Sequence, residues 1–258
     1  MRSVFFYIIL FFSTMILGIA TVIGSFVSRG WPTFMARLWG NLNLWAAGVK
    51  VDIRGLENIN KHGSYIFVSN HQGWFDIFTA LGKLPLRFSW LAKEELFKIP
   101  VLGHAMYKAG YIPIDRKDRR KSMASINRAA EIIRQGTSVF IFPEGTRSAD
   151  GVIRDFKKGI FILASKSQQP IVPVSISGSY RILPKDSWTI YPGEIRFSIG
   201  KPIQTTGIVS GSRDLLIEQV REAIRANLTF EEAGGDSKVE PEIKKADLHD
   251  GGSVCRDG

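Results

Sequence analysis

The stretch that most limits how this chain can fold is an uncharged run near its start. Residues 4–27 include no Asp, Glu, Lys or Arg over 24 positions. As a helix this run would be about 36 Å long, enough to cross the apolar core of a bilayer with some tilt. A cleaved signal peptide fits less well, because the run is long for one and a clear small-x-small cleavage site is missing. The run therefore predicts a membrane-anchoring helix.

The next segment, residues 31–47, combines aromatic and polar side chains at helical spacing. Its apolar positions include Trp31, Phe34, Leu38, Leu42 and Trp45. This pattern fits a helix at the membrane–water interface, and it fits equally well an amphipathic helix packed on the folded body. With the first run, the segment can also form a two-helix hairpin seated in the membrane instead of a single pass. We assign residues 1–48 to a membrane anchor and interfacial helix.

Basic residues are more frequent after the first apolar run than before it. Arg29, Arg37 and Lys50 follow the run, whereas Arg2 alone precedes it. Positive charge close to a membrane helix tends to stay on the cytoplasmic side. We therefore expect a membrane protein with a cytoplasmic body, at the inner membrane if the source is bacterial.

Residues 49–228 alternate between short apolar runs and amphipathic stretches. We expect helices after residue 76 and at 94–108, 119–135, 159–166 and 215–228, and strands at 49–53, 65–68, 87–93, 110–116, 137–142, 171–176 and 194–199. Strands that alternate with helices are typical of an α/β domain. The prediction is a mixed, mainly parallel sheet flanked by helices.

Charge is unevenly distributed along the chain. The net charge is +10, but residues 229–258 hold 8 acidic and 4 basic residues, so the rest of the chain carries +14. A basic body favours anionic partners such as membrane lipid, phosphorylated substrates or nucleic acid. The Gly-, Glu-, Lys- and Asp-rich composition of residues 229–258 predicts a disordered polar tail.

The sequence has few of the residues that build cofactor sites. Cys255 is its only cysteine, which excludes an internal disulfide and a cysteine-based metal site. No cluster of His and carboxylate residues suggests a metal, and neither a dinucleotide fingerprint nor a nucleotide P-loop is present. We expect no metal and no resident cofactor.

The first chemically informative stretch is Asn-His-Gln-Gly-Trp-Phe-Asp at 70–76, between a buried strand and the start of a helix. Ligands gather beyond the carboxyl ends of strands in α/β folds. There His71 can act as a general base, with Asp76 fixing its tautomer and stabilising the imidazolium. Positions five apart do not share a helix face, so the two meet only if His71 lies in the turn before the helix. On this stretch alone, a structural turn that caps the helix explains the residues better.

A second turn, Phe-Pro-Glu-Gly-Thr-Arg-Ser at 142–148, again follows an apolar strand. Pro143 cannot continue a central ladder, and Gly145 permits a tight turn with exposed amides. Arg147 can bind phosphate oxygens through two hydrogen bonds, and Glu144 can orient it or accept from a substrate hydroxyl. A surface turn with a structural Glu–Arg pair is the alternative.

Three cations lie at the end of an expected strand or in the turn that follows it: Lys93, Arg116 and Arg147. Taken singly, each is more simply a solvated surface charge. They can converge on one anion only if their strands are parallel neighbours, because the carboxyl ends of parallel strands share one edge of a sheet.

Taken together, four motifs resemble those of the 1-acylglycerol-3-phosphate acyltransferases, also called lysophosphatidic acid acyltransferases, in the glycerolipid acyltransferase superfamily. The motifs lie in order at 70–76, 110–116, 142–147 and, as Ile-Val-Pro-Val, 171–174. The resemblance covers about residues 49–204. The His-x4-Asp spacing alone is a weak signal, but followed by Phe-Pro-Glu-Gly-Thr-Arg it is a strong one.

The resemblance implies transfer of a fatty acyl group from acyl-CoA or acyl carrier protein to the sn-2 hydroxyl of 1-acylglycerol-3-phosphate, giving phosphatidic acid, by a membrane-bound enzyme. His71 would be the general base and Asp76 its orienting partner. The acceptor and its phosphate would be bound by Lys93, Arg116, Glu144, Gly145, Thr146 and Arg147. Turn amides near His71 or Gly145 are the candidates for an oxyanion hole.

Other function classes explain less of the sequence. A membrane-anchored module that binds anionic lipid or nucleic acid would account for the basic body but not for the two turns, and we expect no nucleic-acid partner. A hydrolase would need a nucleophile, and no Gly-x-Ser-x-Gly elbow is present. Within the superfamily, glycerol-3-phosphate or another lyso-lipid remains an alternative acceptor, and acyl length and the choice of donor stay open.

Overall fold

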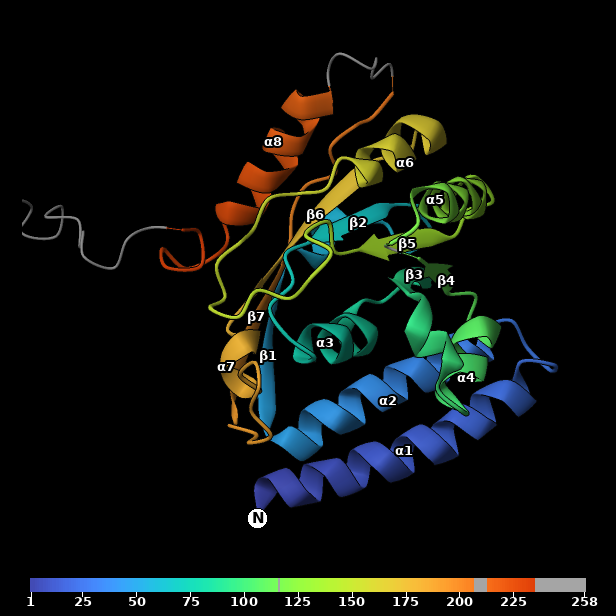
Figure 1. Cartoon of the computed structure of the whole chain (residues 1–258), viewed down its shortest axis with the longest axis vertical. Coiled ribbons are helices and arrows are strands. Elements are labelled where there is room, and N and C mark those ends of the chain that lie inside the picture. The colour runs from blue at the N-terminus through green and yellow to red at the C-terminus, as the bar shows by residue number, and fades with distance from the viewer. Residues whose placement is uncertain (116, 207–212, 235–258) are drawn as a thin grey trace, which may run out of the picture.

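The centre of the computed structural model, which describes residues 1–115, 117–206 and 213–234, is a seven-stranded sheet (Figure 1). The strand order is β1-β7-β6-β2-β5-β3-β4, and neighbours are parallel except for β6 and β7. The predicted mixed, mainly parallel sheet is confirmed. Its strands are β1 (Val49–Arg54), β2 (Ile66–Ser69), β3 (Phe88–Lys93), β4 (Ile112–Ile114), β5 (Ser138–Ile141), β6 (Ile171–Ser177) and β7 (Gly193–Ile199).

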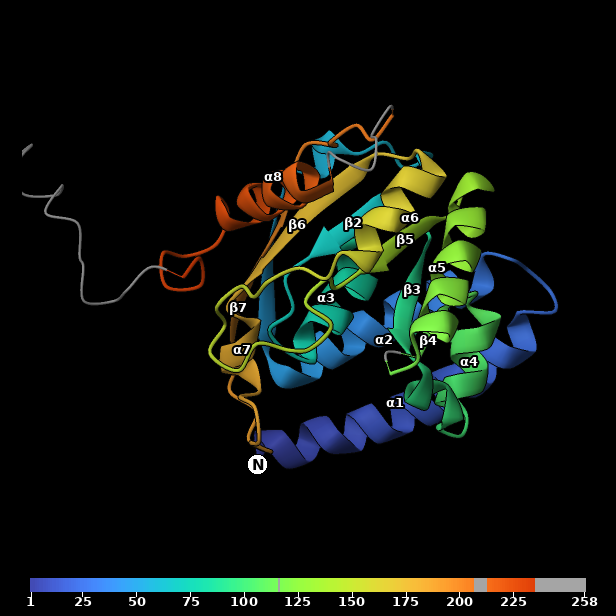
Figure 2. The same ribbon diagram turned by 45° about the horizontal axis from the view of Figure 1, so that its top comes forward.

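Helices cover both faces of the sheet. Figure 2 shows α5, α6 and α8 over one face, while α2 and α3 lie on the other with α1 outside them. The helices are α1 (Arg2–Gly24), α2 (Trp31–Ala47), α3 (Phe75–Lys83), α4 (Leu102–Lys108), α5 (Arg119–Arg134), α6 (Gly159–Ser167), α7 (Ser179–Ile182) and α8 (Arg213–Arg225). Two 3₁₀ turns, η1 (Leu56–Asn58) and η2 (Glu94–Lys98), complete the described elements.

Strand β2 shows how the sequence serves two cores at once. Its four residues are all buried, and the first three, Ile66, Phe67 and Val68, are apolar without alternation, as expected for a strand covered on both faces. Ile66 and Val68 belong to the core under α5, α6 and α8, whereas Phe67 belongs to the core under α2 and α3. The sheet is therefore the middle layer of three.

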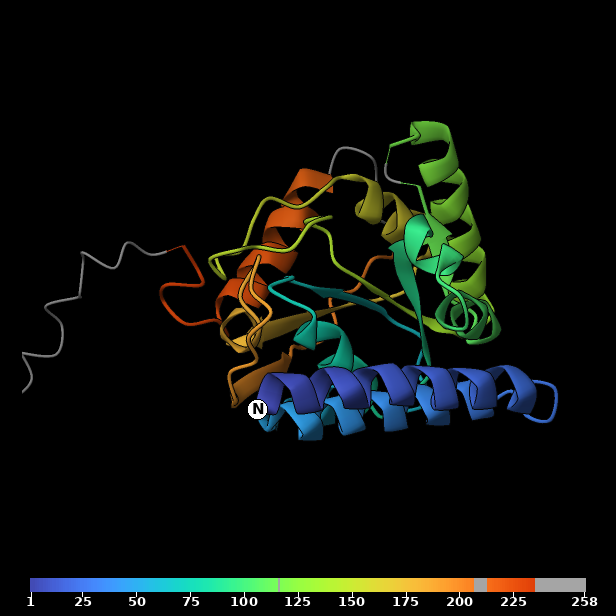
Figure 3. The same ribbon diagram turned by 60° about the horizontal axis from the view of Figure 1, so that its bottom comes forward.

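The two N-terminal helices form an antiparallel hairpin along one side of the body (Figures 1 and 3). Helix α1, with a mean hydropathy of 2.4, is the one described helix long and apolar enough to cross a membrane. It nevertheless lies along the body at both ends. Phe6, only 1% exposed, packs on Phe75 and Phe78, and Lys108 of α4 lies 4.1 Å from the Phe26 ring centroid.

Helix α2 packs directly on α3. The backbones approach closely at Gly40, where an added Cβ would lie 2.7 Å from the Phe78 carbonyl oxygen and 2.8 Å from the Gly82 nitrogen. Arg37 Nη2 donates to the Leu84 carbonyl at 2.8 Å. Of the two alternatives left open for 31–47, the structure shows the helix packed on the body, and its outer side still exposes Trp31, Phe34, Leu38 and Trp45.

The folded part of the chain extends further than the composition suggests. Residues 229–234 form turns after α8, and Glu232 is 1% exposed. The prediction of disorder from Thr229 is therefore wrong for residues 229–234, because buried hydrogen-bond donors elsewhere in the fold hold that segment in place. Residues 235–258 lie outside the described part of the chain.

Four parallel strands bring the predicted site segments to one edge of the sheet. Strand β2 pairs with β5, β5 with β3, and β3 with β4, all in parallel. Lys93 is the last residue of β3, and the turns at 70–73 and 142–148 follow β2 and β5, so these three segments share one edge of the sheet. The condition set by the sequence for convergence of these segments is met.

Candidate active site

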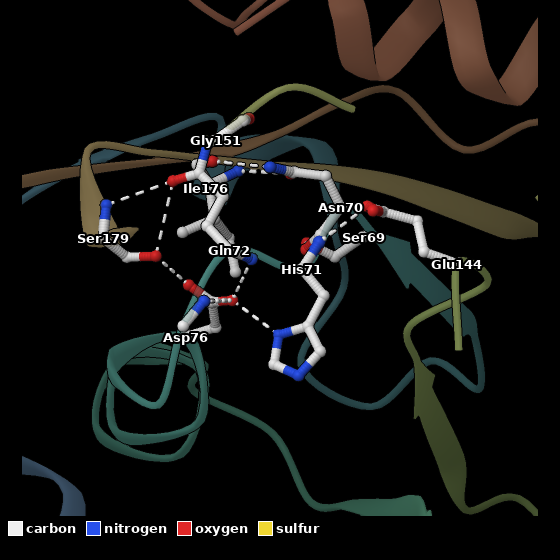
Figure 4. Close-up of polar contacts among 10 residues, drawn as sticks. Ser69, Asn70, His71, Gln72, Asp76, Glu144, Gly151, Ile176 and Ser179 are labelled. Atoms are coloured by element: carbon white, nitrogen blue, oxygen red, sulfur yellow. Dashed lines mark hydrogen bonds and ion pairs between the residues drawn. The ribbon is translucent and has the colours of Figure 1, made fainter. Parts of the chain in front are cut away.

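The turn after β2 is fixed to the neighbouring strand β6 by Asn70. Its side-chain Nδ2 donates to the Ile176 carbonyl at 2.7 Å, and the Ile176 amide donates to Asn70 Oδ1 at 2.9 Å (Figure 4). The side chain thus replaces a backbone partner in the ladder beyond the end of β2, and Asn70 is buried. The residue that follows, His71, therefore leaves the sheet in a defined direction.

His71 and Asp76 meet across the start of α3. Nδ1 of the imidazole lies 2.7 Å from Asp76 Oδ2 (Figure 4). The same oxygen accepts from the Gln72 amide at 2.7 Å and the Gly73 amide at 2.9 Å. His71 lies in the turn before the helix, as the five-residue spacing required, and Asp76, in the first turn of α3, also holds the backbone of that preceding turn.

The ring of His71 is held so that one nitrogen stays available. It stacks on Phe142 with ring centroids 3.9 Å apart and an interplanar angle of 9°, and its side chain is 13% exposed. A carboxylate only accepts hydrogen bonds, so Asp76 selects the tautomer with the proton on Nδ1. Nε2, which points away from Asp76 (Figure 4), then carries the lone pair that a general base needs.

Glu144 supports the backbone of the same turn. Its Oε1 accepts from the His71 amide at 2.8 Å. Its Oε2 is buried and makes no hydrogen bond within the described part of the chain. Burial raises the pKa of Glu144 from 4.5 to about 8, and the hydrogen bond from the His71 amide opposes that rise only in part.

The remaining predicted residues differ in exposure and in the contacts they make. Gly145 adopts φ = +75°, and an added Cβ would lie 2.7 Å from Lys157 Nζ, so a side chain is excluded there. Thr146 and Arg147 are exposed. Lys93 is exposed and pairs with Glu95 at 3.2 Å. Arg116 lies outside the described residues.

Arg147 contacts the catalytic turn through an aromatic ring and not through a carboxylate. Its guanidinium carbon is 5.5 Å from the centroid of Trp74, the residue before α3. The alternative of a Glu144–Arg147 pair has no support among the described ion pairs, because Glu144 faces the His71 amide instead. Arg147 is therefore beside the His71–Asp76 pair and open to solvent.

Two contributors to the site were not singled out from the sequence, Ser179 and Gln72. Ser179 Oγ donates to Asp76 Oδ1, and Gln72 Oε1 accepts from the Ser179 amide at 3.1 Å (Figure 4). Ser179 directly follows Gly178 at the end of β6, the strand beside β2. The sequence could have indicated Ser179 by the rule already applied to the cations. A polar residue just past the end of a parallel strand lies at the carboxyl edge of the sheet, where the other site residues lie.

Four of the turn amides near His71 and Gly145, the candidates for an oxyanion hole, already donate to protein acceptors. The His71 amide donates to Glu144, the Gln72 and Gly73 amides donate to Asp76, and the Gly145 amide donates to the Phe142 carbonyl at 3.2 Å. These four amides stabilise the site, so they do not serve as free donors to a substrate oxygen in this conformation. Within the described ranges, no group of three or more His, Cys, Asp or Glu residues could hold a metal ion.

The arrangement places an imidazole with a free Nε2 beside a buried carboxylate, which is the geometry a general base needs. Comparison with known proteins adds to this description. A family model described as Acyltransferase matches residues 50–177. A chloroplastic 1-acyl-sn-glycerol-3-phosphate acyltransferase of Brassica napus is 38% identical over 205 residues, covering 78% of this chain and 57% of that protein. The human 1-acyl-sn-glycerol-3-phosphate acyltransferase alpha is 32% identical over 199 residues, covering 75% of this chain and 70% of that protein.

A solved structure shares the fold over most of both chains. The crystal structure of the 1-acyl-sn-glycerophosphate (LPA) acyltransferase PlsC from Thermotoga maritima superposes with a TM-score of 0.76 at 30% identity. The match covers 86% of this chain and 91% of that chain. By contrast, this chain spans only 57% of the Brassica napus protein and 65% of an Arabidopsis thaliana relative with the same named activity.

The pKa of Glu144 predicts how stability changes with pH. The carboxyl keeps its proton to about pH 8 when folded but loses it near pH 4.5 when unfolded, so stability falls as pH rises between those values. Glu144→Gln removes this component. One pKa unit is worth about 1.4 kcal/mol, so the parent should lose about 3.5 kcal/mol between about pH 5 and pH 8, which corresponds to roughly 10 °C more in Tm than the variant loses.

Thermal unfolding of both proteins in the same detergent, across that pH range, measures the difference. The side chain of Gln has nearly the shape of Glu and can accept from the His71 amide, so the comparison isolates the proton. Parallel Tm curves for parent and variant would show that Glu144 titrates near its ordinary pKa in the folded protein.

Proposed function

We propose that this chain, which belongs to the acyltransferase family, moves a fatty acyl group from acyl-CoA or acyl carrier protein to the sn-2 hydroxyl of 1-acyl-sn-glycerol-3-phosphate, giving phosphatidic acid. The observation that carries the proposal is the His71–Asp76 pair, 2.7 Å apart, at the carboxyl edge of the sheet. The activity named for relatives that are 30–38% identical, one of which has a solved structure with the same fold, supports the choice of reaction and acceptor.

In the proposed reaction, the substrate hydroxyl takes the place that a serine occupies in a hydrolase. His71 Nε2 removes the hydroxyl proton as the oxygen attacks the thioester carbonyl, and the acyl–sulfur bond breaks. The imidazolium, stabilised by Asp76, then returns the proton to the leaving thiolate, so no acyl-enzyme forms. General-base catalysis of this kind contributes about 10²–10⁴ in rate.

The acceptor phosphate is assigned to the cations at the same edge. Arg147 is exposed beside Trp74 and the catalytic turn, and a guanidinium can bind two phosphate oxygens at once. Lys93 is paired with Glu95 on the surface, and such exposed pairs are weak enough to be exchanged for a substrate anion. Arg116 is assigned by the sequence alone.

We further propose that the helical hairpin lies within one leaflet of the membrane, with the body on the cytoplasmic side. Helix α1 lies against the body at both its ends, so placing it across the bilayer would draw the polar body into the apolar core. Its outer face is apolar along its whole length, with exposed Val4, Phe5, Ile8, Phe11, Phe12, Ile16, Ile19 and Ile23. Trp31, Phe34, Leu38 and Trp45 of α2 extend this face, as expected at a membrane interface.

The first test removes the base. His71→Ala should abolish acyl transfer without loss of expression, and Asp76→Asn should cause a smaller but still large loss, because the tautomer is no longer enforced. Initial rates with a radiolabelled acyl thioester and 1-acyl-sn-glycerol-3-phosphate, at matched protein level, provide the measurement. Activity of His71→Ala within tenfold of the parent would exclude His71 as the base.

The second test concerns the acceptor phosphate. Arg147→Lys keeps the charge but loses the paired hydrogen bonds, so kcat/KM for 1-acyl-sn-glycerol-3-phosphate should fall about tenfold, mainly through the acceptor KM. A neutral monoacylglycerol should be a poor acceptor for the parent and lose little further in the variant.

Arg154→Lys is the matched control for that test. Arg154 is an exposed arginine close by, paired with Asp150 at 2.6 Å, and its replacement should leave both acceptors unaffected. If Arg147 only supports Trp74 and the catalytic turn, Arg147→Lys should instead reduce both acceptors in equal proportion and lower Tm.

The third test measures how α1 lies in the membrane. With Cys255 replaced, single cysteines at Phe5, Phe12 and Ile19, all exposed on α1, would carry a fluorophore in vesicles that contain nitroxide lipids of known depth. A helix in one leaflet predicts the same shallow depth at all three positions, about 5–10 Å into the boundary region. Lys166→Cys on α6, across the sheet, should remain unquenched. A maximum depth at Phe12 alone would indicate a spanning helix.

A further inference from the structure

The segment at 229–234 places a buried carboxylate directly behind the catalytic turn. Glu232, 1% exposed, lies at the carboxyl end of β6, and its backbone carbonyl accepts from the Ile153 amide at 2.9 Å. Arg225 of α8 donates to the Ala233 carbonyl at 3.0 Å. The segment is thus attached to the loop after β5 and to α8 as well as to the sheet edge.

The carboxylate of Glu232 is surrounded by donors. Its Oε1 accepts from Gln72 Nε2 at 3.0 Å and from the Gly178 amide at 2.8 Å. Its Oε2 accepts from Ser177 Oγ, and from the amide and hydroxyl of Thr229 at 3.1 and 2.9 Å. Burial alone would raise the pKa of Glu232, but these hydrogen bonds outweigh it and lower the pKa below its usual value.

Gln72 connects this carboxylate to the catalytic pair. Its Nε2 is committed to Glu232 and to the Gly151 carbonyl, each at 3.0 Å, so its Oε1 is the atom that faces Ser179 (Figure 4). Oε1 accepts from the Ser179 amide at 3.1 Å, and Ser179 Oγ in turn donates to Asp76 Oδ1. An unbroken series of hydrogen bonds therefore runs from Glu232 through Gln72 and Ser179 to Asp76 and His71.

We propose that Glu232 is a positioning residue for acyl transfer: acting through Gln72 and Ser179, it fixes the direction in which Asp76 holds His71. This role rests on the function proposed above. Glu232 orders two separate pieces of the site, because it binds Gln72 in the turn after β2 and Gly178 in the turn after β6. A side chain without acceptors would leave both donors buried and unsatisfied, and Gln72 would lose the contact that sets its amide orientation.

Replacement of Glu232 should lower kcat and leave both substrate KM values unchanged, because Glu232 does not border the exposed acceptor side of the site. Glu232→Ala should reduce kcat about tenfold or more, as small displacements of catalytic groups do. Glu232→Gln should retain much more activity. Its amide oxygen can still accept from Gln72 and Gly178, and the hydroxyls of Ser177 and Thr229 can turn to accept from its NH₂ group. The backbone amide of Thr229, however, also donates to Oε2 and would lose its acceptor, so kcat of Glu232→Gln should remain clearly below the parent value.

Glu231→Gln is the matched control. Glu231 belongs to the same segment, but its side chain is 61% exposed and pairs with Arg181 at 3.2 Å. Its replacement should leave kcat and both KM values at the parent level. Rates are normalised to folded, monodisperse protein, so that any loss of stability does not count as a loss of kcat.

A double substitution separates positioning from general support of the fold. If Glu232 acts through Asp76, adding Glu232→Gln or Glu232→Ala to Asp76→Asn should cost much less than either change costs in the parent background. Multiplicative losses, or full activity of Glu232→Ala, would overturn the positioning role.

If Glu232→Ala does not fold, Glu232→Gln decides the matter: a loss in kcat that shrinks in the Asp76→Asn background supports the role, and parent-level kcat overturns it. An inactive parent would refute the proposed function and this role with it, whereas an active parent with a fully active variant refutes this role alone.

Discussion

The rest of the site depends on the buried carboxylate of Asp76. A buried charge is tolerated only when donors satisfy it, and here the donors come from His71, from the Gln72 and Gly73 amides, and from Ser179. The first three belong to the turn after β2, whereas Ser179 starts α7 after β6. Asp76 can therefore be satisfied only when both turns are in place, which links the geometry of the base to the assembly of the sheet.

Parallel strand order explains why these turns meet. Strand β2 lies between β5 and β6, and all three run in the same direction. The turns after them bring Glu144, His71 and Ser179 to one edge, where a backbone amide of one turn pairs with a side chain of the next. An antiparallel neighbour would place the following turn at the opposite edge, and β7, the antiparallel partner of β6, contributes nothing to this site among the described contacts.

The sequence predicted those parts of the site whose signals are local. These local signals are the apolar run before His71, the glycine and proline at 142–145, and the alternation of strands with helices. Each predicts the structure of its own segment, and the parallel order of the strands then brings the segments together. Glu232 could not be found in this way, because its partner Gln72 is 160 positions away and its own surroundings are rich in charge and glycine. Composition describes an average over a segment, whereas donors from β6 and the catalytic turn select a single carboxylate within it. The separate question of how α2 packs was open for the same reason: its pattern suits both a lipid interface and a protein surface.

That packing connects the membrane-facing side of the molecule to its chemistry. Helix α2 rests on α3 at Gly40, where only a glycine lets the two backbones approach, and Asn41 Nδ2 donates to the Gly82 carbonyl at 3.0 Å. Helix α3 is the element whose first turn holds Asp76. A short helix fixed at one end by the hairpin and at the other by the His71 turn has little freedom to rotate. With the hairpin in one leaflet, as proposed, its depth and tilt would therefore also set the height of His71 above the lipid surface. In the proposed reaction the base must reach a hydroxyl on a lipid still held by its acyl chain, and a rigid connection of this kind, made by polar contacts and a close glycine contact between α2 and α3, would serve that requirement.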